Sequence, residues 1–470
     1  MKITTGMEKG KQQTTSDFHQ YLAALTGSIT IVCTGMHFGW PSPSLPLLLD
    51  EKSHIPMSNS DGSWLAVMPC IGAVVGCCSA AYFVDRIGRR ICMLTTSPLY
   101  FIAWILVAYS KCVGVLHGAR FLAGIADGIA FTAFPIYLGE IAHSSIRGLL
   151  GSSIPVTTIL GFLLINIIGS CFDITSAALL SSTVPVIHFI TFFFMPESPY
   201  YLLMKNRDED AKICLRMFRG TDDVDVELTR LSCAVREDAK STGSIWDLFT
   251  VKSNRKAVFI IMGIRAVQQF SGTTVITFYA KTIFRDAGSN MSSSTAAIIY
   301  FTIQLVVAIL ASILVDKTGR RPLLIFSIIG SGFALATEGI YIYLQTYTDI
   351  DMSELHSIPI VALLVYVVIF NLGMGTIPLL LLGELFPTNV KAFALCLADI
   401  YFGVIVTAVS KFFQIMKDDF GMHVPFLAFT AFCIIGLVFI ITSVPETKGK
   451  TLEEIQMYLR GEEKLEKNNT

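Results

Sequence analysis

The chain is short of charged residues. Of its 470 residues only 15% are Asp, Glu, Lys or Arg, whereas 53% are apolar. A soluble domain carries about 25% charged residues, so this chain could not cover a water-facing surface of its own size. Its net charge of −1 also provides no basic face for nucleic acid. The composition therefore argues against an ordinary soluble protein and against a nucleic-acid-binding one.

Signatures of metal sites and enzymes are missing as well. The sequence has 11 cysteines, but none stands at metal-ligand spacing with histidines, and most lie inside apolar runs as small core or lipid-facing residues. No phosphate-binding loop or nucleophile elbow is found. We therefore expect no cofactor, no metal site, no ATP-driven pump and no enzyme. The first 20 residues lack the apolar core of a cleavable signal peptide, which predicts a short tail at 1–20.

Long apolar runs fill most of the chain. A membrane helix needs about 20 mostly apolar residues, and twelve runs meet that length, six before a charged stretch and six after it. They predict an all-α membrane protein with twelve transmembrane helices in two six-helix bundles. The predicted spans are 21–48, 63–84, 91–110, 114–138, 149–170, 177–195, 257–283, 295–315, 323–345, 358–383, 392–415 and 424–444.

The charged stretch 196–256 divides the chain into two halves. Its pattern predicts a linker with short surface helices. The linker would join an N-terminal bundle at 21–195 to a C-terminal bundle at 257–445, and a tail at 446–470 would follow.

The distribution of Lys and Arg predicts the orientation in the membrane. These residues gather in the linker, in the C-terminal tail and in the loops on the same side. Because such residues face the cytosol in membrane proteins, we expect both termini to be cytosolic. Asn290-Met291-Ser292 then lies in an outside loop and is a candidate glycosylation site.

Three charged motifs occur once in each half, in the same order and on the same predicted side. "DRIGRR" at 85–90 and "DKTGRRP" at 316–322 each follow the second span of a half. Gly-Glu follows the fourth span of each half, and Pro-Glu ends the sixth. Duplicated six-span bundles are typical of secondary transporters, whose substrate site lies near mid-membrane between the halves.

These motifs carry a resemblance to a known family. Together with "RFLAGIADG", "PIYLGEIAHSSIRG", "PESPYYL", "QQFSGTTVITFY", "GELFPTNVK" and "VPETKGKTLEEI", they resemble the sugar porter family of the major facilitator superfamily. The amino-acid sequences of these motifs are most similar to those of insect-type facilitated trehalose transporters and their glucose-transporting relatives. The resemblance covers nearly the whole chain. It implies facilitated transport of a neutral sugar, a glucose-like hexose or trehalose, by alternating access, with the plasma membrane as the default location.

The resemblance also implies a cytosolic gate made of charged residues. The cytosolic ends of the bundles must be held together when the site opens outward, and arginine forks can bind carboxylates there. We expect the motif arginines to pair with the motif glutamates. Each partly exposed pair is worth only about 1 kcal/mol. The predicted gating residues are Asp85, Arg86, Arg89, Arg90, Glu140, Arg147, Glu197, Asp316, Arg320, Arg321, Glu384, Lys391 and Glu446.

The predicted seventh span holds the best candidate sugar site. Gln269, Thr273 and Thr277 recur at i, i+4 and i+8 and would share one stripe, and the paired glutamines stand beside a Ser-Gly break. Such residues either bind a ligand in a wet cavity or bond between membrane helices, and the family resemblance implies that Gln268 and Gln269 are sugar ligands. The predicted substrate-binding residues are Gln268, Gln269, Thr273, Thr274, Gln304, Asn371 and Leu379.

Three expected sugar contacts are apolar in this chain. Leu379 stands where the family usually has Trp, Pro155 where it has Gln, and Phe402 where it has Asn. Asn166 and Asn371 could compensate, or could simply bond between helices. These replacements support an alternative reading, a non-transporting sugar sensor with the same fold.

Two charges fall inside predicted spans. Arg265 lies in the seventh span and Asp399 in the eleventh, both roughly 12–14 Å from the cytosolic face at 1.5 Å per residue. Because a buried lone charge is costly, we expect an Arg265–Asp399 contact. The rival interpretations are that each faces water in the cavity, or that Asp399 binds a proton in a proton-linked symporter. The first span has no carboxylate, which favours passive transport.

Overall fold

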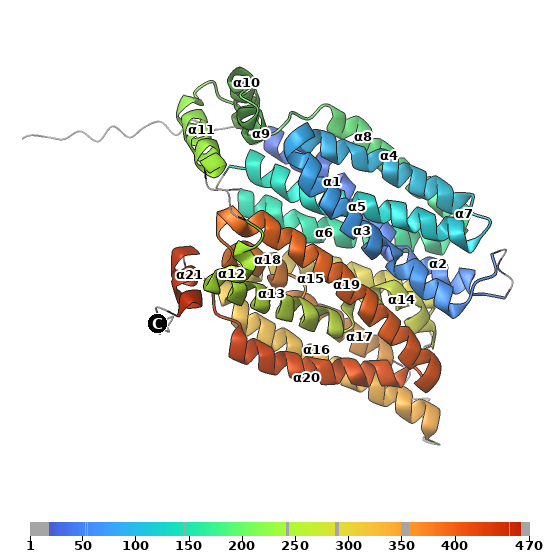
Figure 1. Ribbon diagram of the computed structural model, residues 1–470. Helices are drawn as coiled ribbons and strands as arrows, with labels where there is room; N and C mark the ends of the chain where they lie inside the picture. The colour runs from blue at the N-terminus through green and yellow to red at the C-terminus, as the bar shows by residue number, and fades with distance from the viewer. Residues whose placement is uncertain are drawn as a thin grey trace, which may run out of the picture.

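The molecule consists of two helical bundles that lie side by side (Figure 1). It is a computed structural model that describes residues 18–51, 53, 55–143, 146–240, 244–286, 291–348, 357–450 and 452–461. Within these residues, 11 helical segments are long and apolar enough to cross a membrane. The predicted all-α, multi-pass membrane fold is therefore confirmed. Asn290 lies outside the described residues.

The N-terminal bundle holds the first six spans. Two of these spans are interrupted. The first span of the chain breaks at Trp40, just before Pro41. Pro41 lies in the first turn of α2, where its missing N–H needs no partner and its fixed φ suits the start of a helix. The helices are α1 (Phe18–Gly39), α2 (Pro41–Leu48), α3 (Asn59–Ile87), α4 (Arg89–Ala108), α5 (Val113–Ile141), α6 (Arg147–Cys171), α7 (Ile174–Ser181) and α8 (Thr183–Phe193).

The C-terminal bundle also contains two interrupted spans. They are the seventh and the tenth spans of the chain. The seventh span breaks at Ser271 and Gly272, and Gly272 has a φ of +84°. The predicted span 257–283 thus consists of two helices, divided at the Ser-Gly break seen in the sequence. The helices are α13 (Lys252–Phe270), α14 (Thr273–Asp286), α15 (Ser293–Thr318), α16 (Arg320–Tyr347), α17 (Ile358–Leu372), α18 (Ile377–Leu385), α19 (Thr388–Phe420) and α20 (His423–Ser443).

Short helices gather at one end of the bundles, which we call the linker end; the opposite end is the far end (Figure 1). They are α9 (Pro199–Met204), α10 (Asp208–Arg219), α11 (Asp225–Lys240), α12 (Asp247–Thr250) and α21 (Leu452–Arg460). The helix α10 is amphipathic and buries Phe218 against the N-terminal bundle. Gln20 of α1 donates to the Phe218 carbonyl at 3.0 Å, and Arg219 donates to the Ile141 carbonyl at 2.9 Å.

The two bundles meet mainly along three helix pairs, with a smaller contact between α1 and α14. α3 packs on α19, α6 on α15, and α2 on α14. At Gly403 of α19 a side chain would come within 3.1 Å of the Cys70 carbonyl of α3. Small residues let membrane helices approach this closely. A substrate between the bundles would therefore lie beside these helices.

Candidate transport site and charged clusters

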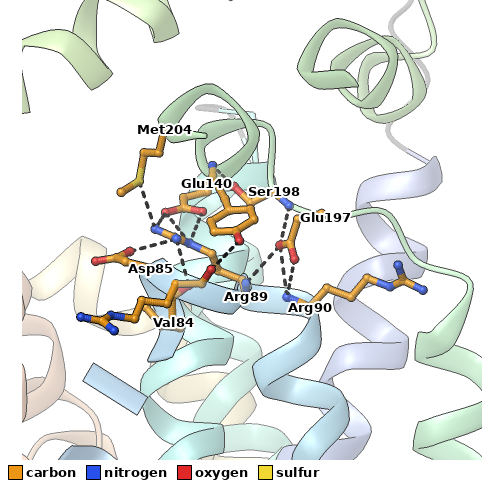
Figure 2. Close-up of polar contacts among 10 residues, drawn as sticks. Val84, Asp85, Arg89, Arg90, Glu140, Glu197, Ser198 and Met204 are labelled. Atoms are coloured by element: carbon orange, nitrogen blue, oxygen red, sulfur yellow. Dashed lines mark hydrogen bonds and ion pairs between the residues drawn. The ribbon is translucent and has the colours of Figure 1, made fainter. Parts of the chain in front are cut away.

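A forked ion pair forms at the linker end of the N-terminal bundle (Figure 2). Arg89, at the start of α4, donates from Nη2 to Oε1 of Glu140 at 2.8 Å and from Nε to Oε2 at 2.9 Å. Its Nη1 lies 2.9 Å from the Asp85 carboxylate. The Arg89 side chain is only 4% exposed and that of Glu140 only 14%. This pair is more deeply buried than the partly exposed pairs expected from the sequence.

Glu197 binds backbone amides rather than an arginine side chain. It accepts hydrogen bonds from the backbone N–H groups of Arg89 and Arg90, each at 3.1 Å, as Figure 2 shows. Burial raises the pKa of the Glu197 carboxyl, although these amide bonds oppose the rise. A carboxylate at the N-terminus of α4 is also stabilised by the helix dipole. The Arg90 side chain donates instead to the Phe193 carbonyl.

The C-terminal bundle builds the same cluster. Arg320 donates from Nη2 to Glu384 at 2.8 Å. Glu446 accepts from the backbone N–H groups of Arg320 and Arg321, each at 3.0 Å. The Arg321 side chain donates to the Ile441 carbonyl at 2.5 Å. The duplication seen in the sequence thus extends to individual hydrogen bonds.

Each of the two charged clusters lies within its own bundle. Among the described residues, each of their ion pairs joins helices of the same half, so the expected clasp between the bundles is not formed in this structure. Lys391 donates to the Gly383 carbonyl at 3.0 Å. Its pKa is lowered by burial and then by the like charge of Arg147, an exposed residue of the other bundle.

Two further predicted gating residues have different surroundings. The Arg86 guanidinium lies 3.9 Å from the centre of the Tyr82 ring and is exposed. The Asp316 side chain lies outside the described part of the chain. The described contact of Arg86 thus lies within its own helix, α3.

A cation joins the two bundles at the far end. Lys411 of α19 donates to the Ser63 hydroxyl of α3, and its Nζ lies 3.4 Å from the Ser60 carbonyl. The same ammonium lies 4.2 Å from the centre of the Trp64 ring. These contacts hold the far ends of α3 and α19 together.

The predicted sugar ligands lie where two broken spans meet. Gln268, near the end of α13, donates from Nε2 to the Met374 carbonyl at 2.7 Å, and Met374 lies in the break between α17 and α18. Gln269 accepts from the Thr274 hydroxyl at 2.5 Å across the break of the seventh span. Discontinuous helices of this kind form the substrate sites of many transporters.

The expected stripe along the seventh span does not exist as one helical face. Gln269 belongs to α13, whereas Thr273 and Thr277 belong to α14 beyond the Gly272 break. Thr277 donates to the carbonyl of Thr273 at 3.0 Å, within its own helix. The predicted stripe extended helical spacing across the Ser-Gly break, but the positive φ of Gly272 ends that spacing.

The remaining candidate residues differ in whether their polar atoms have hydrogen-bond partners. Gln304 of α15 is buried, and its Oε1 has no partner among the described residues. Asn371 donates to the Val367 carbonyl of its own helix at 2.8 Å. Asn166 accepts from Ser42 at 2.8 Å and therefore bonds between helices. Leu379 is 41% exposed.

Arg265 and Asp399 do not form the expected ion pair in the described part of the chain. The Arg265 Nη1 donates instead to Oε1 of Gln268 at 3.1 Å. The guanidinium carbon lies 5.3 Å from the centre of the Phe402 ring. The structure thus places Arg265 beside a predicted sugar ligand.

One buried polar cluster in the N-terminal bundle was not predicted from the sequence. Asp127 accepts from the Tyr100 hydroxyl at 2.8 Å, and that hydroxyl lies 2.7 Å from the hydroxyl of Thr34. Arg120 donates to the His37 carbonyl at 2.6 Å. The available signal was the pair of charged residues inside the fourth predicted span, since such residues in membrane spans usually have partners.

Comparison with known proteins places the chain among transporters. A family model described as "Sugar (and other) transporter" matches residues 8–459. The facilitated trehalose transporter Tret1 of Culex quinquefasciatus is 32% identical over 450 residues, which cover 94% of this chain and 86% of that protein. The Tret1 of Anopheles gambiae is 32% identical over 448 residues, which cover 94% of this chain and 56% of that protein. This chain therefore spans little more than half the length of the Anopheles relative.

Two solved structures show the same fold. The proton:xylose symporter XylE bound to 6-bromo-6-deoxy-D-glucose has a TM-score of 0.76 and 24% identity, covering 94% of this chain and 99% of that one. The inward-open xylose transporter XylE from E. coli also has a TM-score of 0.76, with 22% identity, covering 93% of this chain and 99% of that one. Both support the arrangement of two six-span bundles.

Proposed function

The chain belongs to the sugar transporter family, and on that premise we propose that it carries a neutral sugar, a glucose-like hexose or trehalose, down its gradient across the plasma membrane. The observation that carries this proposal is the meeting of two broken spans at Gln268 and Met374. Helix breaks free backbone groups and bring polar side chains to the middle of the membrane, where a sugar needs hydrogen bonds. We propose that Gln268, Gln269, Thr274 and Gln304 bind the sugar.

Alternating access requires two bodies that move as units. The Arg89–Glu140 pair and the Arg320–Glu384 pair each tie together helices of one bundle, which supports rigid movement of each half. Arg147 and Lys391 carry like charges, one in each bundle, and their repulsion would oppose closure of the linker end. We propose that the linker end faces the cytosol and that these charges contribute to its gate.

Purified protein in liposomes provides the test. We expect uptake of radiolabelled glucose or trehalose without a pH gradient. We also expect Gln268→Ala and Gln269→Ala each to raise the KM for the sugar by about tenfold, because each variant loses the hydrogen bonds of one glutamine side chain. Thr337→Ala is the matched control, because Thr337 is exposed and bonds within its own helix to Phe333.

Two results would redirect the proposal. Binding of either sugar without uptake would favour the sensor, which the apolar residues at Leu379, Pro155 and Phe402 support. Uptake that occurs only with an inward proton gradient would favour a symporter, for which Asp399 is the candidate proton site.

A further inference from the structure

Arg265 lies deep in the C-terminal bundle, on the face that carries Gln268. Thirteen residues separate it from the start of α13 at Lys252, which is about 20 Å of helix. The residue is only 9% exposed. Residues three apart on a helix are neighbours on its surface, and Arg265 uses this spacing to donate to Gln268 at 3.1 Å.

The guanidinium of Arg265 is incompletely satisfied. It has five N–H donors, and its Nε is buried with no partner among the described residues. Its other contacts are Gln268 and the face of the Phe402 ring. A charged group at this depth in a membrane protein needs partners or a water-filled cavity. The free donor therefore points to a missing partner, beside a predicted sugar ligand.

The position of Phe402 suggests what that partner is. Phe402 stands where the family resemblance places an Asn that contacts the sugar, and a phenyl ring cannot donate a hydrogen bond. Arg265 lies over this ring at 5.3 Å and so brings donors to the place where the amide is lost. An arginine can stack on an aromatic ring and still hydrogen-bond with its edge.

We propose that Arg265 contacts the substrate, and that its guanidinium donates to sugar hydroxyls in place of the missing asparagine amide. Asp399 lies one turn before Phe402 on α19, so its carboxylate stands near the ring that Arg265 contacts and opposes the charge of the guanidinium. A site with opposed charges suits a neutral sugar. This inference rests on the proposed function and adds a consequence: removing the Asp399 charge leaves an uncompensated cation, and the site then accepts a sugar that bears a carboxylate.

Direct binding to purified full-length protein tests the contact separately from transport. The probes are glucose, trehalose and glucuronate, and the readout is calorimetry or intrinsic tryptophan fluorescence. Arg265→Met fills the volume without donors, and Arg265→Lys keeps the charge without the planar fork. We expect both variants to weaken binding of the neutral sugar by about ten- to hundredfold. Monodispersity and thermal unfolding report whether each variant is folded.

Lys256→Met is the matched control. Lys256 lies on the same helix and its Nζ is 4.8 Å from the centre of the Tyr458 ring, so it is also a cation on an aromatic ring, but away from the predicted site. We expect the Lys256→Met variant to bind the neutral sugars with the same affinity as the wild type. Folded Arg265→Lys with wild-type affinity would overturn the proposal while leaving the transport function intact.

Glucuronate binding tests the charge balance between Arg265 and Asp399. We expect Asp399→Asn to bind glucuronate at least tenfold more tightly than the wild type does, because Arg265 then lacks its counter-charge. Unchanged glucuronate affinity in folded Asp399→Asn would overturn the charge-balance argument. If the wild type binds neither neutral sugar, the proposed function and this inference both fail.

Discussion

Arg89 and Glu140 form a forked ion pair inside the N-terminal bundle, with Nη2–Oε1 at 2.8 Å and Nε–Oε2 at 2.9 Å. Arg320 and Glu384 repeat it in the other bundle. The position of these pairs bears on what they do. A pair between the bundles would have to break in every transport cycle, whereas a pair inside one bundle can persist and hold its helices together.

Loss of the Arg89 side chain should destabilise the protein strongly. Arg89→Ala leaves Glu140 buried without its main partner, which typically costs about 3–5 kcal/mol for a buried pair. Thermal or denaturant unfolding of the purified protein would measure this. Arg207→Ala is the control, because the Arg207–Asp210 pair is 59% and 49% exposed and should contribute less than about 1 kcal/mol. Equal losses in the two variants would contradict the bracing role.

The Lys411 contact should favour closure of the far end. Lys411→Met removes the hydrogen bond to Ser63 and the contact with Trp64 across the bundles. We expect a shift of about 1 kcal/mol, or roughly fivefold in population, toward a state with the far end open. Spin-label distances across the far ends of α3 and α19 would detect it. Lys417→Met should leave them unchanged, because Lys417 pairs with Asp286 of its own bundle.

Native cysteines can establish the orientation of the chain. Cys112 and Cys171 are exposed at the far end, and Cys233 is exposed on α11 at the linker end. With the linker end in the cytosol, a membrane-impermeant maleimide applied to intact cells should label the first two, and should reach Cys233 only after permeabilisation. Single-cysteine variants distinguish the sites. Labelling of Cys233 on intact cells would reverse the proposed topology.

The break at Gly272 should be essential for the site. Gly272 has a φ of +84°, and a Cβ there would come within 2.5 Å of the Phe429 ring. Gly272→Ala should therefore cost at least about 1–3 kcal/mol from the backbone conformation alone and should displace Gln268 and Gln269. Unfolding and uptake assays would show both effects. Gly118→Ala on α5, where a Cβ meets nothing within 4 Å, should be neutral or slightly stabilising.

Much of the architecture could be predicted from local patterns. Apolar runs of membrane-spanning length identified the spans, and the repeated motifs around Arg89 and Arg320 identified the duplication. The family resemblance implied that the motif arginines pair with the motif glutamates, but it assigned no partners and placed the contacts between the bundles rather than inside them. The Ser-Gly break in the seventh span was visible in the sequence, but periodicity could not show that Gln269 lies on a different helix from Thr273 and Thr277, because helical spacing holds only within one helix.

The sequence by itself determined that this protein is a duplicated membrane protein, because apolar runs of about 20 residues form helices that satisfy their own backbone groups in lipid. Only the tertiary structure decided which groups meet. Glu197 reaches the backbone amides of α4 and not the Arg90 side chain. Arg265 reaches Gln268 and Phe402 and not Asp399. Such choices depend on distances of a few ångströms between helices far apart in the chain, which no local pattern encodes.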